Sequence, residues 1–391
     1  MKLSVLGSTG SIGRSTLSVV EHINSLTPDR FEIDVLIAGQ NVDLLAAQAI
    51  AMKARHAVIE DESRLEPLRN ALSGHDISCG AGQAAVLEAA ARPVDKTMAA
   101  ISGTAGLLPT LAAIDAGNTI LLANKETMVC AGPMVLQRAR DKGIRIVPVD
   151  SEHNAIFQVL EDRNTPEKIT LTASGGPFRN ASLEELSKAT PEMALAHPNW
   201  DMGAKNSLDS ATMMNKGLEL IEACYLFGFP ESQIDVLVHP QSIIHSMVSY
   251  VDGSVLAQLG VPDMRTPIAH ALAWPERIET AVDRLDLGVL SRLDFDRPDD
   301  ERFPAISLAR LASREGALGT CVYNAANEAA GEAFLKGKCG FLSIAENVRF
   351  ALDKALDRGC NEVPRSVDSI DAVLHVTERV SAWINQNLKY Q

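Results

Sequence analysis

The sequence predicts an α/β protein: a doubly wound, Rossmann-like parallel sheet, then a second α/β domain, then a C-terminal helical bundle. Three observations support this. Short β-branched runs alternate with helical patterns up to residue 149, strand-like runs surround one long helix up to residue 274, and helical patterns fill the end of the chain. We expect the parts to span 1–149, 150–274 and 300–391, with a connecting arm at 275–299.

The first part contains six candidate strands separated by helical stretches whose apolar residues recur near a 3.6-residue period. The predicted strands are Leu3–Leu6, Phe31–Ala38, His56–Ile59, Thr97–Ile101, Thr119–Ala123 and Ile144–Val149. The predicted helices include Arg14–Ile23, Val42–Lys53, Gln83–Arg92 and Leu107–Ala116.

The second part has four strand-like runs and one helix near Ser210–Phe227, and Asp252-Gly253 marks a tight hairpin. The runs are Lys168–Ala173, Asp235–Val238, Ile243–Tyr250 and Ser254–Leu259. The arm is charged and has no sustained period. Four helices should form the final bundle: Pro304–Glu315, Val322–Lys336, Ile344–Leu356 and Ser369–Asn387.

Composition excludes several classes of protein. The 391 residues are 46% hydrophobic and 22% charged, which excludes general disorder, and a net charge of -14 is the wrong sign for a nucleic-acid binder. No apolar stretch approaches the roughly 20 residues that span a bilayer, so no membrane association is expected. The six cysteines lack paired or metal-finger spacing, which favours reduced thiols and a cytoplasmic protein.

A glycine-rich loop, GSTGSIG at 7–13, directly follows the first strand and opens the first helix. Glycines at this place let backbone N–H groups and the positive helix end approach a pyrophosphate, although a plain tight turn is the alternative. After the second strand the chain reads Ala38-Gly39-Gln40-Asn41, without the carboxylate that would bind the ribose of NAD. NADP is therefore favoured.

Two carboxylates, Asp150 and Glu152, follow the strand Ile144–Val149 at the sheet edge where ligands usually bind. In extended backbone, residues two apart project to the same side, so both can face one point. Converging carboxylates repel unless a cation or a proton lies between them, and two solvated acids are the alternative.

The predicted helix near Ser210–Phe227 has a polar stripe that would suit an anionic, hydroxylated ligand, although such stripes are more often solvated faces. The stripe consists of Thr212, Asn215, Lys216, Glu219 and Glu222. Glu219 could add a third carboxylate to Asp150 and Glu152. Three carboxylates without Cys or His favour Mg²⁺ or Mn²⁺ over zinc.

Other features fit phosphate binding and closure. Ser174-Gly175-Gly176-Pro177 follows a strand and offers backbone donors beside a hydroxyl, and Ser210, near the start of the predicted helix, is either an anion ligand or an N-cap. The loop 197–203, HPNWDMG, is interpreted as a lid rather than an ordinary connection. His239 and His245 are interpreted as structural.

These residues resemble one enzyme family, 1-deoxy-D-xylulose 5-phosphate reductoisomerase. The resemblance rests on ordered blocks across residues 1–275 and on NAANE at 324–328. The blocks are GSTGSIG at 7–13, LLANKE at 121–126, PVDSEHNAIFQ at 148–158, ASGGPF at 173–178, HPNWDMG at 197–203, SATMMNKGLELIEA at 210–223, HPQSIIHSMV at 239–248 and GVPDMRTPIAHALAWP at 260–275.

The resemblance implies NADPH-dependent conversion of 1-deoxy-D-xylulose 5-phosphate to 2-C-methyl-D-erythritol 4-phosphate in the non-mevalonate isoprenoid pathway, by a homodimer joined through the sheet of a catalytic second domain. It implies a Mg²⁺ or Mn²⁺ site formed by Asp150, Glu152 and Glu219, with Lys125 as a further catalytic residue. The implied contacts to the sugar phosphate are Lys125, Ser151, Glu152, Ser174, His197, Ser210, Asn215, Lys216 and Glu219. The implied NADPH contacts are Thr9, Gly10, Ser11, Ile12, Gly39, Gln40, Asn41, Asn124, Glu126 and Gly203.

Two other functions stay open at this point. A dehydrogenase acting on another phosphorylated or amino-acid aldehyde would share the first domain but would not need three converging carboxylates. A non-catalytic nucleotide sensor would bind the cofactor without metal-dependent turnover.

Overall fold

The computed structural model describes residues 1–161, 163–196 and 203–388. The chain divides into two compact units, each formed by several segments. The first unit comprises 1–127, 135–154 and 263–284, and the second comprises 128–134, 155–262 and 285–391. The boundaries predicted at 149, 274 and 299 stay predictions.

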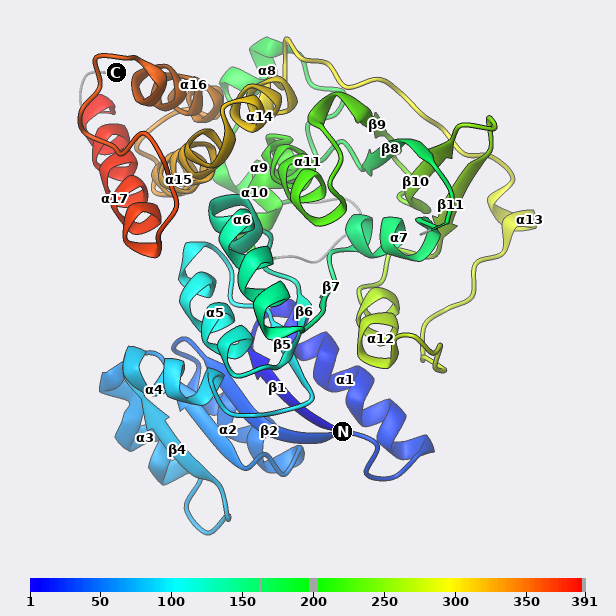
Figure 1. Ribbon diagram of the computed structural model, residues 1–391, viewed down its shortest axis with the longest axis vertical. Helices are drawn as coiled ribbons and strands as arrows, with labels where there is room; N and C mark the ends of the chain where they lie inside the picture. The colour runs from blue at the N-terminus through cyan, green and yellow to red at the C-terminus, as the bar shows by residue number, and fades with distance from the viewer. Residues whose placement is uncertain (162, 197–202, 389–391) are drawn as a thin grey trace. The chain divides into compact units, whose positions relative to one another are not determined.

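The first unit contains a seven-stranded parallel sheet in the order β4-β3-β2-β1-β5-β6-β7, drawn from dark blue (β1) to blue-green (β7) in Figure 1. Its strands are β1 (Lys2–Leu6), β2 (Glu32–Ala38), β3 (His56–Ile59), β4 (Ser78–Ala81), β5 (Lys96–Ala99), β6 (Thr119–Leu122) and β7 (Ile146–Pro148). Apolar runs such as Val35–Ala38 are buried, as strands covered on both faces require. The predicted doubly wound sheet is confirmed.

Helices connect these strands and begin or end at local signals. They are α1 (Ser11–Leu26), α2 (Val42–Ala51), α3 (Leu65–Ala71), α4 (Gly82–Ala90), α5 (Leu107–Asp115), α6 (Lys125–Lys142) and α7 (Ser151–Val159), with short 3₁₀ turns at Glu62–Arg64 and Thr104–Gly106. Asn41 and Asn124 cap α2 and α6 with their side chains, and Gly143 ends α6 in the left-handed conformation.

A later segment of the chain completes the first unit. Helix α12 (Arg265–Ala273) packs against α1. The Lys96 ammonium donates to the carbonyl oxygen of Leu272 at 2.6 Å, and the Arg145 guanidinium lies 4.2 Å from the Trp274 ring centroid. The cation at the carboxyl end of α12 complements the helix dipole.

The second unit contains a four-stranded sheet in the order β11-β10-β8-β9. Its strands are β8 (Pro166–Ala173), β9 (Ile234–Val238), β10 (Ile244–Tyr250) and β11 (Val255–Leu259). β8 and β9 are parallel, whereas β10 is antiparallel to both β8 and β11. All four strands match the predicted runs, and the turn at Gly253 has the positive φ of 88° that its glycine permits.

The helices of the second unit are α8 (Leu183–Ser187), α9 (Pro191–Leu195), α10 (Ala204–Ala211), α11 (Met214–Phe227), α13 (Leu287–Leu290), α14 (Ala305–Arg314), α15 (Gly316–Leu335), α16 (Ser343–Leu356) and α17 (Ile370–Asn387), with a 3₁₀ turn at Glu231–Gln233. The last four match the predicted bundle. α15 contacts α14, α16 and α17, and its faces are buried almost throughout.

The predicted single helix near Ser210–Phe227 is wrong in one respect. Two helices, α10 and α11, occupy this stretch and meet at Thr212 and Met213, where Met213 has a φ of 62°. A left-handed residue interrupts the helical hydrogen bonding, and the apolar period continues across it, which hides the break from a periodicity argument.

Within the described ranges, no helix has the length and apolar character needed to cross a membrane. All six cysteines are free thiols.

Candidate functional site

The glycine loop follows β1, at the point between β1 and β5 where the strand order of the sheet reverses. Backbone N–H groups of Gly7 and Ser8 donate to the Ile37 carbonyl oxygen at 2.9 and 2.8 Å. A Cβ on Gly7 would lie 2.5 Å from the Ala100 carbonyl oxygen, and one on Gly13 would lie 2.3 Å from that of Gly7. These approaches explain two of the three glycines and place the loop in the crevice where nucleotides bind in open sheets.

The helix that follows this loop leaves its amino end available. Gly10 caps α1 without a side-chain acceptor, and the first turn contains no acidic residue. The first N–H groups of a helix have no intrahelical acceptor, and the helix dipole makes that end positive. Thr9, Gly10, Ser11 and Ile12 thus lie at a helix start with the charge and free donors that an anion-binding site needs.

The segment after β2 has a partly structural role. The Asn41 side chain accepts a hydrogen bond from the Leu44 N–H at 3.1 Å and so caps α2, whereas Gln40 is exposed and Gly39 is half-buried. Neither Gly39, Gln40 nor Asn41 bears a negative charge, so the segment has nothing that would repel a 2′-phosphate.

The start of α6 joins a loop to the sheet. The Asn124 side chain accepts from the Thr127 N–H at 2.7 Å and donates to the Gly103 carbonyl oxygen at 2.9 Å and to a Glu126 carboxylate oxygen at 3.1 Å. The next residue, Lys125, is buried. Asn124 and Glu126 therefore fix the conformation of the loop after β6, which leads into Lys125 at the start of α6.

Lys125 and His153 flank the Asp150 carboxylate. The Lys125 ammonium lies 2.8 Å from Asp150 Oδ2, and His153 Nδ1 lies 3.1 Å from Oδ1. Burial alone would raise the pKa of Asp150, but the Lys125 charge and the contacts from His153 outweigh it and hold that pKa well below its usual range. Asp150 is therefore an oriented carboxylate that stays ionised at neutral pH.

The predicted extended conformation of Asp150-Ser151-Glu152 is wrong. Ser151 begins helix α7, so Glu152 lies in its first turn and its N–H faces Asp150 Oδ1 at 3.3 Å. The Ser151 hydroxyl donates to the Glu152 carboxylate at 2.5 Å. A carboxylate in the first turn of a helix is favoured by the dipole, and here the turn, not a strand, brings the two acids together.

In the second unit, the loop after β8 packs onto the end of α10. Gly175 and Gly176 have φ values of 83° and 65°, and a Cβ on Gly176 would lie 2.7 Å from the Ser210 carbonyl oxygen. The Gly176 N–H donates to Ser174 Oγ at 3.2 Å. Ser174 and Ser210, predicted from separate segments, therefore lie on backbones in contact.

Ser210 does not have the predicted place at a helix start. It is the last residue but one of α10, before the break at Thr212 and Met213. Asn215 and Lys216 lie in the first turn of α11, and Thr212 lies before that helix, so the predicted stripe begins at Asn215. The stripe is not a solvated face, because Lys216, Glu219 and Glu222 are buried.

Charges within α11 compensate one another. The Lys216 ammonium pairs with one oxygen of Glu219, and the Asn215 amide donates to the other. Glu219 is the third predicted metal ligand, and its carboxylate, like those of Asp150 and Glu152, offers hard oxygen donors. Hard oxygen donors of this kind suit Mg²⁺.

His197 and the rest of the predicted lid up to residue 202 lie outside the described residues. Gly203, which follows them, is the N-cap of α10. His239 has both ring nitrogens bonded to backbone, Nδ1 to the Asp294 carbonyl oxygen at 2.8 Å and Nε2 to the Ile243 N–H at 3.2 Å, as a structural histidine would.

Comparison with known proteins supplies the family. A family model described as 1-deoxy-D-xylulose 5-phosphate reductoisomerase matches residues 3–132, and two models of its C-terminal domain match 146–227 and 259–382. The reductoisomerase of Rhodospirillum centenum is 52% identical over 97% of this chain and 94% of its own length. That of Gluconobacter oxydans is 52% identical over 100% of this chain and 94% of its own. The chain belongs to the 1-deoxy-D-xylulose 5-phosphate reductoisomerase family.

Solved structures of family members have the same fold. The Zymomonas mobilis reductoisomerase in complex with NADPH is 47% identical, with a TM-score of 0.90 over 100% of this chain and 99% of that one. A reductoisomerase in complex with NADPH, fosmidomycin and magnesium is 43% identical, with a TM-score of 0.93 over 100% of this chain and 98% of that one.

One residue of this reductoisomerase family member was missed by sequence reasoning. His153 is fully buried and orients Asp150, yet it is not among the predicted site residues. A histidine three residues after an acid at a helix start is a usable signal, because these positions face each other only if the segment is helical.

Proposed function

We infer that this protein catalyses the NADPH- and metal-dependent conversion of 1-deoxy-D-xylulose 5-phosphate to 2-C-methyl-D-erythritol 4-phosphate, a step of isoprenoid biosynthesis. It is an oxidoreductase that uses NADP. The full-length match to the reductoisomerase family supports this function, and solved relatives are complexed with NADPH and with magnesium. The single structural observation that favours it over a plain dehydrogenase is the pair of acids Asp150 and Glu152, oriented beside Lys125 in the first unit.

The proposed metal ligands are Asp150, Glu152 and Glu219. Their carboxylate oxygens fit a hard divalent cation, and magnesium is the ion named for the solved relatives. When bound, Mg²⁺ would polarise a carbonyl and a neighbouring hydroxyl of the sugar phosphate and offset negative charge that develops there. Manganese is the alternative that donor chemistry alone leaves open.

The residues around Asp150 hold its carboxylate in a fixed orientation before the substrate binds. Lys125 and His153 fix both oxygens of Asp150 in one orientation, so little rotational freedom is lost on binding. Lys125 is also the proposed donor to a substrate oxygen, since its buried ammonium already lies beside this carboxylate. Ser151 holds Glu152 in the same way.

The proposed phosphate cradle combines Ser174, Ser210, Asn215 and Lys216. The contact between Gly176 and the Ser210 carbonyl places two hydroxyl-bearing segments together, and the first turn of α11 adds an amide and a buried cation. The buried Lys216 ammonium has already lost most of its water on folding, so binding a phosphate costs it little further dehydration. By resemblance alone, His197 joins this set.

The proposed NADPH site lies at the amino end of α1 and along the ends of β2 and β6, with Gly203 added by resemblance. When bound, NADPH would supply the hydride. The contributions of the chain are the open helix start at Gly10, the uncharged segment after β2 and the loop held by Asn124 and Glu126.

The proposed assembly is a homodimer joined along β11. This strand lies at the edge of its sheet, and Val255, Leu256 and Leu259 on it are 55%, 37% and 36% exposed. An apolar edge strand with unpaired backbone groups favours pairing with a second copy. The proposed location is the cytoplasm, supported by six free thiols and by the use of NADPH.

The decisive experiment is an assay of NADPH oxidation with 1-deoxy-D-xylulose 5-phosphate, with and without a chelator, followed by product analysis. We expect turnover that is lost with chelator, regained with Mg²⁺ and accompanied by a branched carbon skeleton. Hydride transfer without a branched product would favour the plain dehydrogenase. Cofactor binding without turnover would favour the nucleotide sensor.

A further inference from the structure

The corner between α10 and α11 is a strained feature that stands next to the proposed phosphate cradle. Met213 has a φ of 62°, a conformation that non-glycine residues adopt only where the surroundings impose it. Ser210 lies three residues before Met213, and Asn215 two residues after it. The conformation of this one residue therefore sets the distance between the two halves of the cradle.

The Thr212 side chain makes hydrogen bonds inside the corner, but these do not tie the corner to the rest of the unit. Thr212 Oγ1 donates to the Leu208 carbonyl oxygen at 3.0 Å and accepts from the Met214 N–H at 3.3 Å. Both contacts are local in sequence. An external support is needed to keep the turn in a single position.

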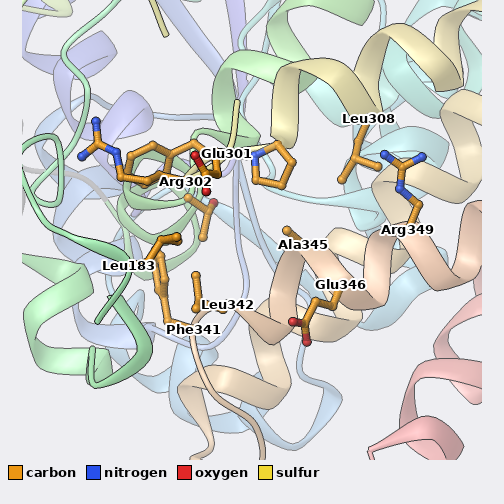
Figure 2. A pocket seen from close by; sticks show the side chains of 12 residues that line it. Leu183, Glu301, Arg302, Leu308, Phe341, Leu342, Ala345, Glu346 and Arg349 are labelled. Atoms are coloured by element: carbon orange, nitrogen blue, oxygen red, sulfur yellow. The ribbon is translucent and has the colours of Figure 1, made fainter. Parts of the chain in front are cut away.

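On one side, the corner borders a cavity instead of a packed core. Thr212 is among the residues that line a pocket of about 310 Å³, together with Pro304, Leu308 and Phe341. Figure 2 shows Leu308 and Phe341 on different sides of this open space. Apart from the loop after β8, which packs onto the end of α10, the support must come from another element.

Helix α15 supplies that support on both arms of the corner. Asn327 donates from Nδ2 to Asp209 Oδ1 at 2.8 Å, and Asp209 directly precedes Ser210. One turn earlier on the same face of α15, the Tyr323 hydroxyl lies 3.1 Å from the sulfur of Met214, which directly precedes Asn215.

Both contacts are buried and tight. Asp209, Asn327 and Tyr323 are 4%, 2% and 0% exposed, and the second oxygen of Asp209 pairs with Lys205 at 2.7 Å. Tyr323 donates its single proton to the Ala305 carbonyl oxygen at 3.2 Å, the stronger acceptor, so its contact with Met214 is one of packing.

A glycine on α11 fits this packing. A Cβ on Gly217 would lie 2.0 Å from the Tyr323 hydroxyl. No side chain could stand between α11 and the Tyr323 ring at this point. The first turn of α11, which carries Asn215 and Lys216, is thus pressed directly onto α15.

We propose that Asn327 is a positioning residue for substrate phosphate, acting with Tyr323 through Asp209 and Met214 to hold Ser210 at a set distance from Asn215 and Lys216. The inference rests on the proposed function, because it takes these residues as the phosphate cradle. Asn327 itself does not touch substrate. None of the proposed contacts to the metal, the cofactor or the sugar includes a residue of the NAANE segment, and the positioning role gives this segment a function.

The test compares Asn327→Leu, which keeps the side-chain size and removes the donor, with the wild type. We expect KM for 1-deoxy-D-xylulose 5-phosphate to rise about tenfold or more, as loss of a hydrogen bond to a charged group would do, with kcat within about threefold. The dissociation constant of NADPH should not change. Glu332→Gln, on an exposed turn of α15, is the matched control and should leave KM unchanged.

A charge-swapped pair separates positioning from a general effect on stability. Asn327→Asp places a second carboxylate against Asp209 and should raise KM further. Adding Asp209→Asn restores one donor and one acceptor between the two positions but removes the Lys205 ion pair, so KM should recover in part, to below that of Asn327→Asp alone. No recovery in a folded double variant would overturn the proposal.

A phosphate-free readout distinguishes this inference from the proposed function. With unphosphorylated 1-deoxy-D-xylulose, kcat/KM should be equal in wild type and Asn327→Leu, because the cradle is not engaged. Calorimetric titration with inorganic phosphate should show at least tenfold weaker binding in the variant, whether or not the enzyme turns over. If the wild type is active and Asn327→Leu has the same KM, the positioning role is contradicted but the proposed function is not. If the wild type neither turns over the sugar phosphate nor binds phosphate, both the positioning role and the proposed function are contradicted.

Discussion

Asp150 shows what a sequence can and cannot predict about a single residue. Its place at the end of a strand, beside Glu152, predicts a carboxylate that faces a ligand. The conformation that brings Asp150 and Glu152 together is a helix start and not the predicted extended segment. Local preference in Ser151-Glu152 is ambiguous, because Ser and Glu are common both at helix starts and after strands.

Replacing Asp150 with Asn tests its role as a metal ligand. Asp150→Asn removes a charge that Lys125 and His153 already hold ionised and oriented. We expect kcat to fall by about 10³-fold or more while the dissociation constant of NADPH stays within about twofold, since the metal acts on charge that develops in the reaction. Steady-state kinetics and cofactor fluorescence measure both. Near-normal turnover would refute the assignment.

Lys216 belongs to the proposed phosphate cradle, and its substitution should act mainly on KM. Lys216→Ala removes a buried ammonium that is paired with Glu219. We expect KM for the sugar phosphate to rise by about 10²-fold with a smaller change in kcat. Lys216→Arg, which keeps the charge, is the control. An effect limited to NADPH binding would count against the phosphate role.

His245 should make stability depend on pH. Burial lowers the pKa of His245 to about 4, with Lys216 and His239 adding repulsion and the backbone at Gly260 and Val261 opposing it. Between about pH 4 and 6.5 the unfolded chain binds a proton that the folded chain does not, so the free energy of unfolding decreases as pH falls through this range.

Comparing the wild type with His245→Gln measures how protonation of His245 changes the free energy of unfolding. The wild-type free energy of unfolding should lose up to about 1.4 kcal/mol more per pH unit than the variant's between pH 6.5 and 4. Urea titrations at several pH values measure the slopes. His270, whose pKa is also lowered to about 4, is present in both proteins and cancels. Parallel slopes would show that His245 is not held neutral.

At the scale of elements, periodicity and turn signals predict most of the chain. The strands of the second unit and the helices α14, α16 and α17 agree with the predicted runs to within two residues, whereas α15 begins at Gly316, six residues before the predicted Val322. Strand β4, with the sequence Ser78–Ala81, is not predicted, because a short segment ending in Gly and Ala lacks β-branched residues. The break at Met213 is missed because tertiary packing, not local sequence, imposes it.

Gly217 tests the packing of α11 on α15. Gly217→Ala adds a methyl group 2.0 Å from the Tyr323 hydroxyl, and overpacking of this kind costs about 1–3 kcal/mol of unfolding free energy. Gly331→Ala is the matched control, since there the new Cβ would lie 3.3 Å from the flexible end of Leu208. The control should be neutral or slightly stabilising in urea unfolding. Equal effects of the two substitutions would contradict tight packing at Gly217.

At the scale of the whole molecule, the proposed dimer is the property that is hardest to predict from the sequence of one chain. The amino-acid composition gives no sign of a dimer, whereas the apolar edge strand β11 does. Light scattering should give a mass near twice 42.0 kDa for the wild type, and Val255→Lys on the exposed edge should shift it toward one chain. Lys168→Gln, on β8 of the same sheet, is the control. A wild-type mass of one chain would contradict the proposed assembly.

The segment 263–284 belongs to the first unit although it follows residues 155–262 of the second unit in sequence, and this affects how the protein folds during its synthesis on the ribosome. The β-strands that begin this unit leave the ribosome early, but α12, which packs on α1 and receives the Lys96 ammonium at its carboxyl end, emerges only after the whole four-stranded sheet of the second unit. The nascent first unit must therefore wait with apolar surface uncovered. A fragment ending near residue 150 should accordingly be prone to aggregation and a poor substitute for the intact chain.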